Sequence, residues 1–179
     1  MKKLKLLKKD QKTNFYQIYT LAYNNAVELL SEAEILYGAG KHARAYFLAF
    51  TALEEISKSQ LAADVYTGLT GVEEFWNYYK SHEEKTKRMT WATLDANEFP
   101  NNIFNEMGEV VNVNKPKIKK RMNSLYVYIN KESKVINPKN TISVEDAKDM
   151  IHTVNVAIHQ TFLMTEYYGH QIGTKGFMK

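Results

Sequence analysis

The sequence predicts an all-α fold, and two observations support that prediction. Of the 179 residues only eight are glycine and three are proline, so long stretches lack the residues that interrupt helices. Those stretches repeat apolar residues with the helical period. The chain also contains no cysteine, and a chain of this length buries a core without disulfides or structural metals. We therefore expect one antiparallel bundle domain over residues 13–170, between a flexible lysine-rich arm (1–12) and a flexible tail (171–179).

The first two of the predicted four to five main helices should form an antiparallel hairpin. The first is expected from about residue 14 to residue 37, with Gly38 and Gly40 ending it. The second follows at once, over about residues 41–66, and its apolar residues cover well over half of its circumference. The predicted inward stripe of the first helix is Leu21, Ala22, Ala26, Leu29, Leu30, Ala33 and Leu36.

A third helix should start near Val72 and run toward Met89 or beyond. Gly68 and Gly71 separate it from the second helix. This helix carries Trp76, and one of its sides is predicted to hold Phe75, Tyr79, His82 and Met89.

The helical pattern weakens over residues 97–140, and we expect an irregular segment there, with only residues 103–111 resembling another helical piece. Within it, residues 125–129 alternate in a strand-like way and are expected to pair with residues 134–136. Ser143 and Asp146 then form a capping-box-like start of a last helix that reaches about Tyr168. Its predicted inward stripe is Ala147, Ile151, Val154, Ile158, Phe162 and Thr165.

The charge distribution narrows the classes of function. Residues 1–12 hold six lysines and one aspartate, a net charge of +5, so the rest of the chain sums to −1 of the total +4. The basicity of the chain is therefore a property of the arm, and only a local basic patch would indicate binding of nucleic acid.

The opening residues lack an uninterrupted apolar stretch and a cleavage region, and no run approaches the roughly 20 apolar residues of a membrane span. We expect a cytoplasmic protein without a membrane segment.

The predicted second helix carries one polar strip, where any chemistry should lie. Arg44, Thr51, Glu55 and Lys58 fall within about 60° of its circumference, with Glu54 beside them. One interpretation is a solvated face with a Glu54–Lys58 pair. The other is that the third helix packs beside the strip, so that His82 meets Glu55 and Lys58, and a carboxylate fixes the tautomer of the imidazole. The pattern leaves both open, because His82 equally suits a packing residue.

A second candidate site is the basic run of residues 115–121. Five of its seven residues are cations, namely Lys115, Lys117, Lys119, Lys120 and Arg121, and Tyr126 follows closely. Clustered cations neutralise phosphates and exposed tyrosines stack on unpaired bases, so this run is the best candidate for contact with RNA. A lysine-rich solvated loop is the alternative. No metal site is expected, because His152 and His159 lie about 10 Å apart along a helix, and no cofactor motif is present.

The ordered motifs of residues 20–150 resemble the AbiV-type abortive-infection proteins of the HEPN superfamily. The matching pieces are Asn25-Ala26, Gly40-Lys-His-Ala-Arg44-Ala-Tyr, Ala52-Leu-Glu-Glu55-Ile-Ser-Lys58, Phe75-Trp76, Ser81-His82-Glu-Glu-Lys85, Arg121 before Leu125-Tyr126-Val127, Asn137-Pro138 and the helix entry from Ser143 to Ala147.

This resemblance implies a HEPN helical bundle, a homodimer, and bacterial defence against phage by arrest of the infected cell. It implies RNA or the translation machinery as target and a phage protein as activator. Many HEPN proteins are metal-independent endoribonucleases with an arginine four to six residues before a histidine, and this sequence lacks that spacing after Arg44, Arg88 and Arg121.

Two functions therefore stay open. In the first, the protein is an RNase in which His82 transfers protons, Glu55 orients it, and Lys58, Lys85 and Arg121 stabilise phosphate charge, with Arg44 and the basic run binding RNA. In the second, it is a noncatalytic interaction or sensor protein that binds a phage, ribosomal or RNA partner, and the same polar strip fixes the fold.

Overall fold

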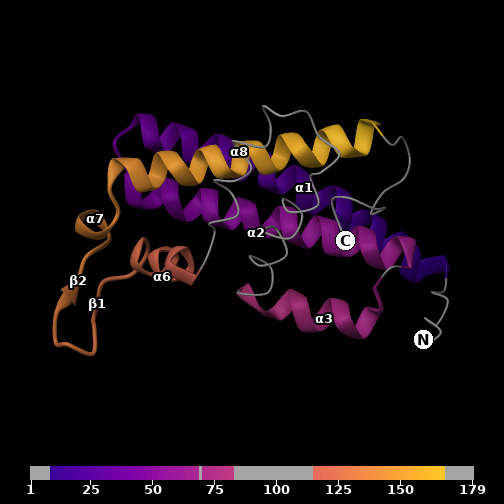
Figure 1. Cartoon of the computed structure of the whole chain (residues 1–179), viewed down its shortest axis with the longest axis horizontal. Coiled ribbons are helices and arrows are strands. Elements are labelled where there is room, and N and C mark those ends of the chain that lie inside the picture. Colours follow the sequence, from indigo (N-terminus) through magenta and orange to yellow (C-terminus); the bar gives the residue numbers. More distant parts are fainter. Residues whose placement is uncertain (1–8, 69, 83–114, 168–179) are drawn as a thin grey trace.

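The computed structural model describes residues 9–68, 70–82 and 115–167, and it confirms the all-α class. Three long helices lie side by side: α1 (Lys9–Gly38), α2 (His42–Thr67) and α8 (Val144–Tyr167). Figure 1 shows α2 between these neighbours on one side and two shorter helices, α3 (Val72–Lys80) and α6 (Lys115–Asn123), on the other. The predicted helical piece at residues 103–111 lies outside the described residues.

The hairpin of α1 and α2 forms as predicted, and its turn shows why. Gly40 has a φ of 72°, the left-handed conformation that glycine adopts without a steric penalty. The Lys41 N–H donates to the Leu36 carbonyl at 2.8 Å and the Gly40 N–H to the Tyr37 carbonyl at 3.0 Å. This pair of bonds is a Schellman motif, which satisfies the last carbonyl groups of α1 and turns the chain into α2.

Helix α1 begins five residues before the predicted start, inside the segment predicted as an arm. Lysine, glutamine and aspartate at its start are compatible with a helical backbone. The first buried side chain described in α1 is Phe15, whose ring meets the edge of the Phe75 ring from α3 at a centroid distance of 4.9 Å. This contact fixes the early turns of α1 beside the C-terminal half of α2, where Leu61 and Val65 complete a small apolar cluster.

The main core lies between α1, α2 and α8. Alanines at the contacts, including Ala26, Ala33, Ala49 and Ala52, let the helices approach closely, and Phe50 fills the space between them. Leu21 was predicted in the inward stripe of α1, but its side chain is exposed. It lies about 100° around the helix from the buried Ala22, on the same side as the exposed Ile35.

Helix α8 begins with the predicted capping box. The Ser143 N–H donates to Asp146 Oδ2 at 3.1 Å, and the Asp146 N–H donates back to Ser143 Oγ at 3.0 Å. Ala147 and Val154 of its predicted stripe are buried, as are Met150 and Ala157. The side chains of Phe162 and Thr165 lie outside the described part of the chain.

The third helix is shorter than predicted. Helix α3 ends at Lys80, and Ser81 leaves the helix in an extended conformation, with its N–H donating to the Tyr78 carbonyl at 3.1 Å. Serine is common at helix ends because its hydroxyl competes for backbone hydrogen bonds. The position of His82 is therefore set by this bend and not by the face of α3.

The segment predicted as irregular contains a helix that the sequence did not reveal. Residues 115–123 form α6, so the basic run is helical and not a loop. The predicted hairpin follows in shortened form: β1 (Tyr128–Ile129) pairs antiparallel with β2 (Val135–Ile136), while residues 125–127 lie outside the strands. A single turn, α7 (Pro138–Thr141), leads into α8, with the Asn137 side chain accepting from the Lys139 N–H at 3.1 Å.

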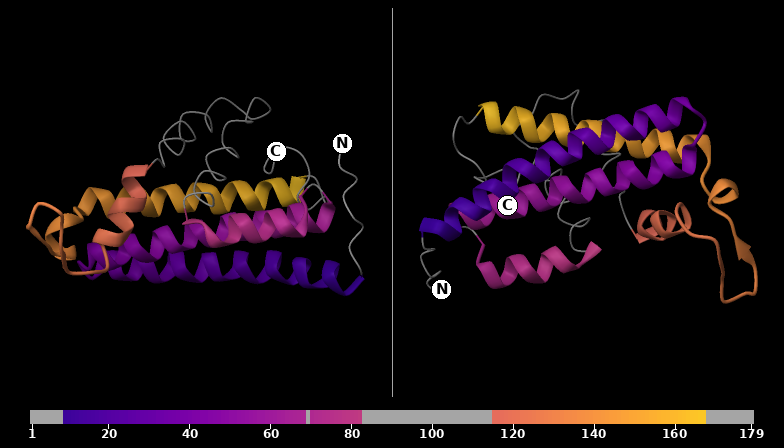
Figure 2. Two further views of the ribbon diagram at one scale, coloured as in Figure 1. Left: turned by 90° about the horizontal axis from the view of Figure 1, so that it is seen from below. Right: turned by 180° about the vertical axis from the view of Figure 1, so that it is seen from behind.

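These elements place two short helices one after the other on one side of α2, with α3 along the bundle and α6 across it (Figure 2). The views in Figure 2 show α3 running back along α2 so that its last turn points toward α6, while the hairpin and α7 lie at one end of the bundle. In the part of the chain that the structure describes, no helix is long and apolar enough to cross a membrane.

Candidate functional site

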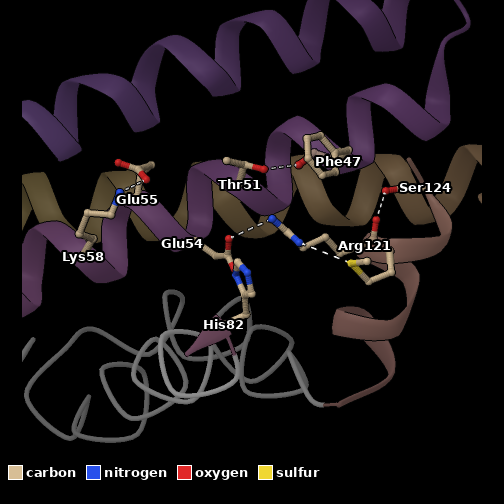
Figure 3. Close-up of polar contacts among 9 residues, drawn as sticks. Phe47, Thr51, Glu54, Glu55, Lys58, His82, Arg121 and Ser124 are labelled. Atoms are coloured by element: carbon tan, nitrogen blue, oxygen red, sulfur yellow. Dashed lines mark hydrogen bonds and ion pairs between the residues drawn. The ribbon is translucent and has the colours of Figure 1, made fainter. Parts of the chain in front are cut away.

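Three charged or titratable side chains from different elements meet in the middle of α2. Glu54 of α2 contacts His82 Nδ1 with one carboxylate oxygen, and its other oxygen lies 3.6 Å from the terminal Nη2 of Arg121 in α6. Figure 3 shows the histidine and the arginine reaching the carboxylate from different directions. We call Glu54, His82 and Arg121 the Glu54 cluster.

Glu54 is the buried centre of this cluster. Its side chain is only 5% exposed, and a carboxylate removed from water to this extent is strongly unfavourable unless cations or donors surround it. The sequence explains the burial: Phe47, Phe50 and Leu61 stand seven, four and seven residues away, which places them on the same face of the helix. The partners of Glu54 therefore come from α6 and from the end of α3.

Arg121 lies against aromatic rings as well as against the carboxylate. Its guanidinium carbon is 5.2 Å from the centre of the Phe47 ring and 5.8 Å from that of Phe50. The side chain is 15% exposed, and its buried Nε has no hydrogen-bond partner among the described residues. A guanidinium loses less hydration than an ammonium and is attracted by ring faces, so arginine suits this position better than lysine.

His82 is the accessible member of the Glu54 cluster, with a side chain that is 51% exposed. A neutral imidazole that donates its Nδ1–H to a carboxylate carries its basic lone pair on Nε2. Glu54 thereby supplies the tautomer that general acid–base chemistry requires. The cluster thus joins a buried carboxylate, a cation and a histidine in contact with solvent.

The predicted grouping of Glu55, Lys58 and His82 is wrong, because the carboxylate that contacts His82 is that of Glu54 and not that of Glu55. Lys58 forms an ion pair with Glu55, and its Nζ lies 5.4 Å from the centre of the Tyr79 ring, whereas His82 contacts Glu54. Consecutive helical residues point about 100° apart, so Glu54 and Glu55 serve different partners, as Figure 3 shows. The alternative interpretation expected a Glu54–Lys58 pair. Lys58 instead pairs with Glu55, and Glu54 contacts His82 and Arg121.

Glu54 was missed as a site residue because the four polar residues within 60° of one another form the adjacent strip. The available signal was its spacing from Phe47 and Phe50, since a carboxylate on an aromatic face requires a partner. Thr51 of the strip donates its hydroxyl to the Phe47 carbonyl at 2.9 Å, and Arg44 is exposed near the start of α2.

The predicted RNA-binding residues divide into two kinds. Lys119 and Tyr126 are exposed, as a ligand contact requires. Lys120, in contrast, places its Nζ 2.5 Å from Asp146 Oδ1 at the start of α8. The whole of Lys85 and the side chains of Lys115 and Lys117 lie outside the described residues.

Among the described residues, no group of three or more histidine, aspartate or glutamate side chains lies close enough together to hold a metal ion.

Asp146 is a carboxyl group whose pKa the surroundings lower. Burial raises its pKa, but hydrogen bonds from Lys120 and Ser143 and the charge of Lys120 outweigh burial, so the net pKa lies below the usual value. Burial in the core, together with the nearby charge of Asp146, raises the pKa of the Tyr46 hydroxyl. Both groups therefore keep their ordinary charge at neutral pH.

Comparison with known proteins identifies the family. The family model described as AbiV, of the HEPN class, matches residues 15–159, a span that includes every member of the Glu54 cluster. Searches among curated proteins and among solved structures found no significant match. Because the family model covers most of the sequence, the chain belongs to the AbiV family of HEPN proteins.

Proposed function

We propose that this protein defends bacteria against phage by arresting the infected cell, and that it does so by cleaving RNA at the Glu54 cluster. Membership of the AbiV family supports the role in abortive infection. One observation carries the chemistry: His82 and Arg121, far apart in the sequence, lie on the two oxygens of one buried carboxylate. The cluster thus supplies in space the arginine and histidine that the sequence does not offer at the usual spacing.

The proposed reaction needs a proton acceptor and a stabiliser of negative charge. His82 Nε2 takes the proton of a ribose 2′-hydroxyl, whose oxygen forms a bond with the adjacent phosphorus. The bond from phosphorus to the 5′-oxygen breaks and that oxygen takes a proton from water, leaving a 2′,3′-cyclic phosphate, while His82 returns the proton that it gained to the solvent. Glu54 holds the imidazole, and Arg121 offsets the charge that develops on the phosphate oxygens. Arg121 has donors to spare, since its described contact with Glu54, at 3.6 Å, is longer than a hydrogen bond.

A second candidate function is a noncatalytic one. The position of Arg121 between Glu54 and two phenylalanine rings, with 15% of its side chain exposed, favours a clamp that fixes α6 against α2. In that case the protein arrests the cell by binding a ribosomal, RNA or phage partner.

Our proposal also includes a cytoplasmic location, activation by a phage protein and a homodimer.

Purified protein incubated with total RNA in the presence of a chelator distinguishes the two candidates. We expect cleavage products ending in 2′,3′-cyclic phosphate, and we expect His82→Ala and Glu54→Gln to abolish them. His152→Ala is the matched control, because His152 is also an exposed histidine and belongs to α8, which contributes no member to the Glu54 cluster. Intact RNA with wild-type protein that still arrests cells would establish the noncatalytic function.

A further inference from the structure

We infer that Lys120 is a positioning residue: its ion pair with Asp146 holds α6 against α8, so that the next residue, Arg121, reaches Glu54. This inference rests on the proposed function of the Glu54 cluster. It replaces the expectation, drawn from the basic run, that Lys120 contacts RNA.

The geometry of α6 carries the inference. Lys120 and Arg121 are consecutive, yet the first pairs with Asp146 at the start of α8 and the second with Glu54 in the middle of α2. A helix turns about 100° between consecutive residues, so α6 lies across two long helices and is held to each by one cation. Its last residue, Asn123, and the following Ser124 are buried, which seats the C-terminal end of α6.

The capping box of α8 orients the Asp146 carboxylate toward Lys120. The capping box uses Asp146 Oδ2 at 3.1 Å from the Ser143 N–H, and this contact orients Oδ1 toward Lys120. The lowered pKa of Asp146 agrees with an ion pair that is present at neutral pH. Lys120 thus meets a carboxylate whose direction is already fixed by the first turn of α8.

The exposure of the pair sets how large its effect can be. The side chains of Lys120 and Asp146 are 40% and 22% exposed, and ion pairs near the surface contribute little to global stability. Losing this pair should therefore leave the bundle folded but release α6 more often. Arg121 would then lie less often at Glu54.

The first test is phage resistance in cells, compared across charge variants. Lys120→Gln and Asp146→Asn should each lower resistance several-fold, and the double variant should be no worse than either single one, because both remove the same pair. The amide introduced by Asp146→Asn keeps an oxygen for the Ser143 N–H, so the cap is retained. Lys120→Arg should preserve resistance. Lys148→Gln, which changes an exposed lysine of α8, is the control and should behave as wild type.

The second test measures the docking of α6 without any activity. The chain has no cysteine, so Ser124→Cys introduces a single thiol at a position with no exposed surface. Thiol-specific labelling of this variant reports how often the end of α6 leaves α2 and α8. We expect Lys120→Gln or Asp146→Asn to speed labelling several-fold, with the melting temperature nearly unchanged.

The outcomes separate the inference from the proposed function. If Lys120→Gln lowers resistance while Asp146→Asn preserves it, Lys120 acts as a free cation, as a contact with RNA would require, and the inference fails. Unchanged labelling in both variants also overturns it. If labelling responds as expected but His82→Ala and Glu54→Gln leave resistance intact, Lys120 still holds α6 and the proposed function fails.

Discussion

The bundle of α1, α2 and α8 and the segment from α6 to the β-hairpin are stabilised in different ways. In the bundle, alanines and large apolar side chains such as Phe50 are fully buried, and the hydrophobic effect favours the burial of each of them. In the segment from α6 to the hairpin, the described apolar side chains of Met122, Tyr126, Val127 and Ile129 are exposed. That segment is held instead by charges and hydrogen bonds at a few points, among them Lys120 and Arg121.

This difference teaches where the function of the protein can be adjusted. Burial in the bundle fixes the direction of Glu54, and the weaker attachment of α6 decides whether Arg121 is present beside it. A site assembled across such a boundary can lose one member while the fold persists. Mutations in the two regions should therefore separate stability from activity.

The largest expected effect comes from the bundle. Phe50→Ala should lower the free energy of unfolding by about 3 to 5 kcal/mol, because it leaves a cavity between the long helices. Tyr126→Ala, in the exposed segment, is the matched aromatic control and should change it by no more than about 0.5 kcal/mol. Urea unfolding measures both, and similar losses in the two variants would remove the contrast between the regions.

Arg121→Ala should come next, with a loss of about 2 to 3 kcal/mol, somewhat below the roughly 3 to 5 kcal/mol for breaking a fully buried pair. The loss arises because Glu54 keeps its burial but loses its cation. Replacing both partners, as in Glu54→Leu with Arg121→Met, should recover much of the stability while phage resistance stays absent. Resistance in that stable double variant would show that the cluster is only structural.

Ser143→Ala should cost about 1 kcal/mol, the usual effect of removing a serine cap. Ser143 Oγ accepts a hydrogen bond from the Asp146 N–H, and the loss of this bond accounts for the expected decrease in stability. The melting temperature should fall by a few degrees, while labelling at Ser124→Cys rises, because the Ser143 hydroxyl also hydrogen-bonds the Asp146 carboxyl group and only the backbone N–H of residue 143 would then orient that carboxyl group. A lower melting temperature with unchanged labelling would separate the cap from the attachment of α6.

The smallest expected effect is the pH dependence that Asp146 contributes. Its pKa is lowered in the folded protein, so its contribution to stability is present above the ordinary aspartate pKa and disappears as pH falls through the lowered folded value. At neutral pH the free energy of unfolding of the wild type should exceed that of Asp146→Asn by less than about 1 kcal/mol. As pH falls into the acid range, the free energies of unfolding of the two proteins should converge. A constant difference at all pH values would assign the effect of Asp146→Asn to packing.

The bundle could be predicted well from the sequence because periodicity and glycine carry most of that information. The stripe of α1, the turn at Gly40 and the capping box of α8 each follow from local rules. Helix α6 escaped prediction because its nine residues, KPKIKKRMN, include few apolar ones. No stripe marks such a helix, and its position depends on carboxylates supplied by other elements.

The candidate site required more precision than periodicity provides. Choosing Glu54 over Glu55 means fixing the rotation of α2 to better than the roughly 100° between consecutive residues, at a point where Glu55 belongs to the polar strip and Glu54 lies beside it. The bend at Ser81 added a second unknown, because it redirects His82 away from the face predicted for α3. The identities of His82 and Arg121 as site residues stay a prediction that the variants above test.

The adjacency of Lys120 and Arg121 also limits how the protein can evolve. A single residue inserted between Lys120 and Arg121 would rotate one cation relative to the other by about 100°, and one inserted between Arg121 and Ser124 would rotate both cations relative to the buried end of α6. Residues 130–134, the exposed turn between the two short strands, have no such restriction. Among relatives, changes in chain length should therefore collect in the hairpin turn, and the spacing from the cations of α6 to its buried end should stay constant.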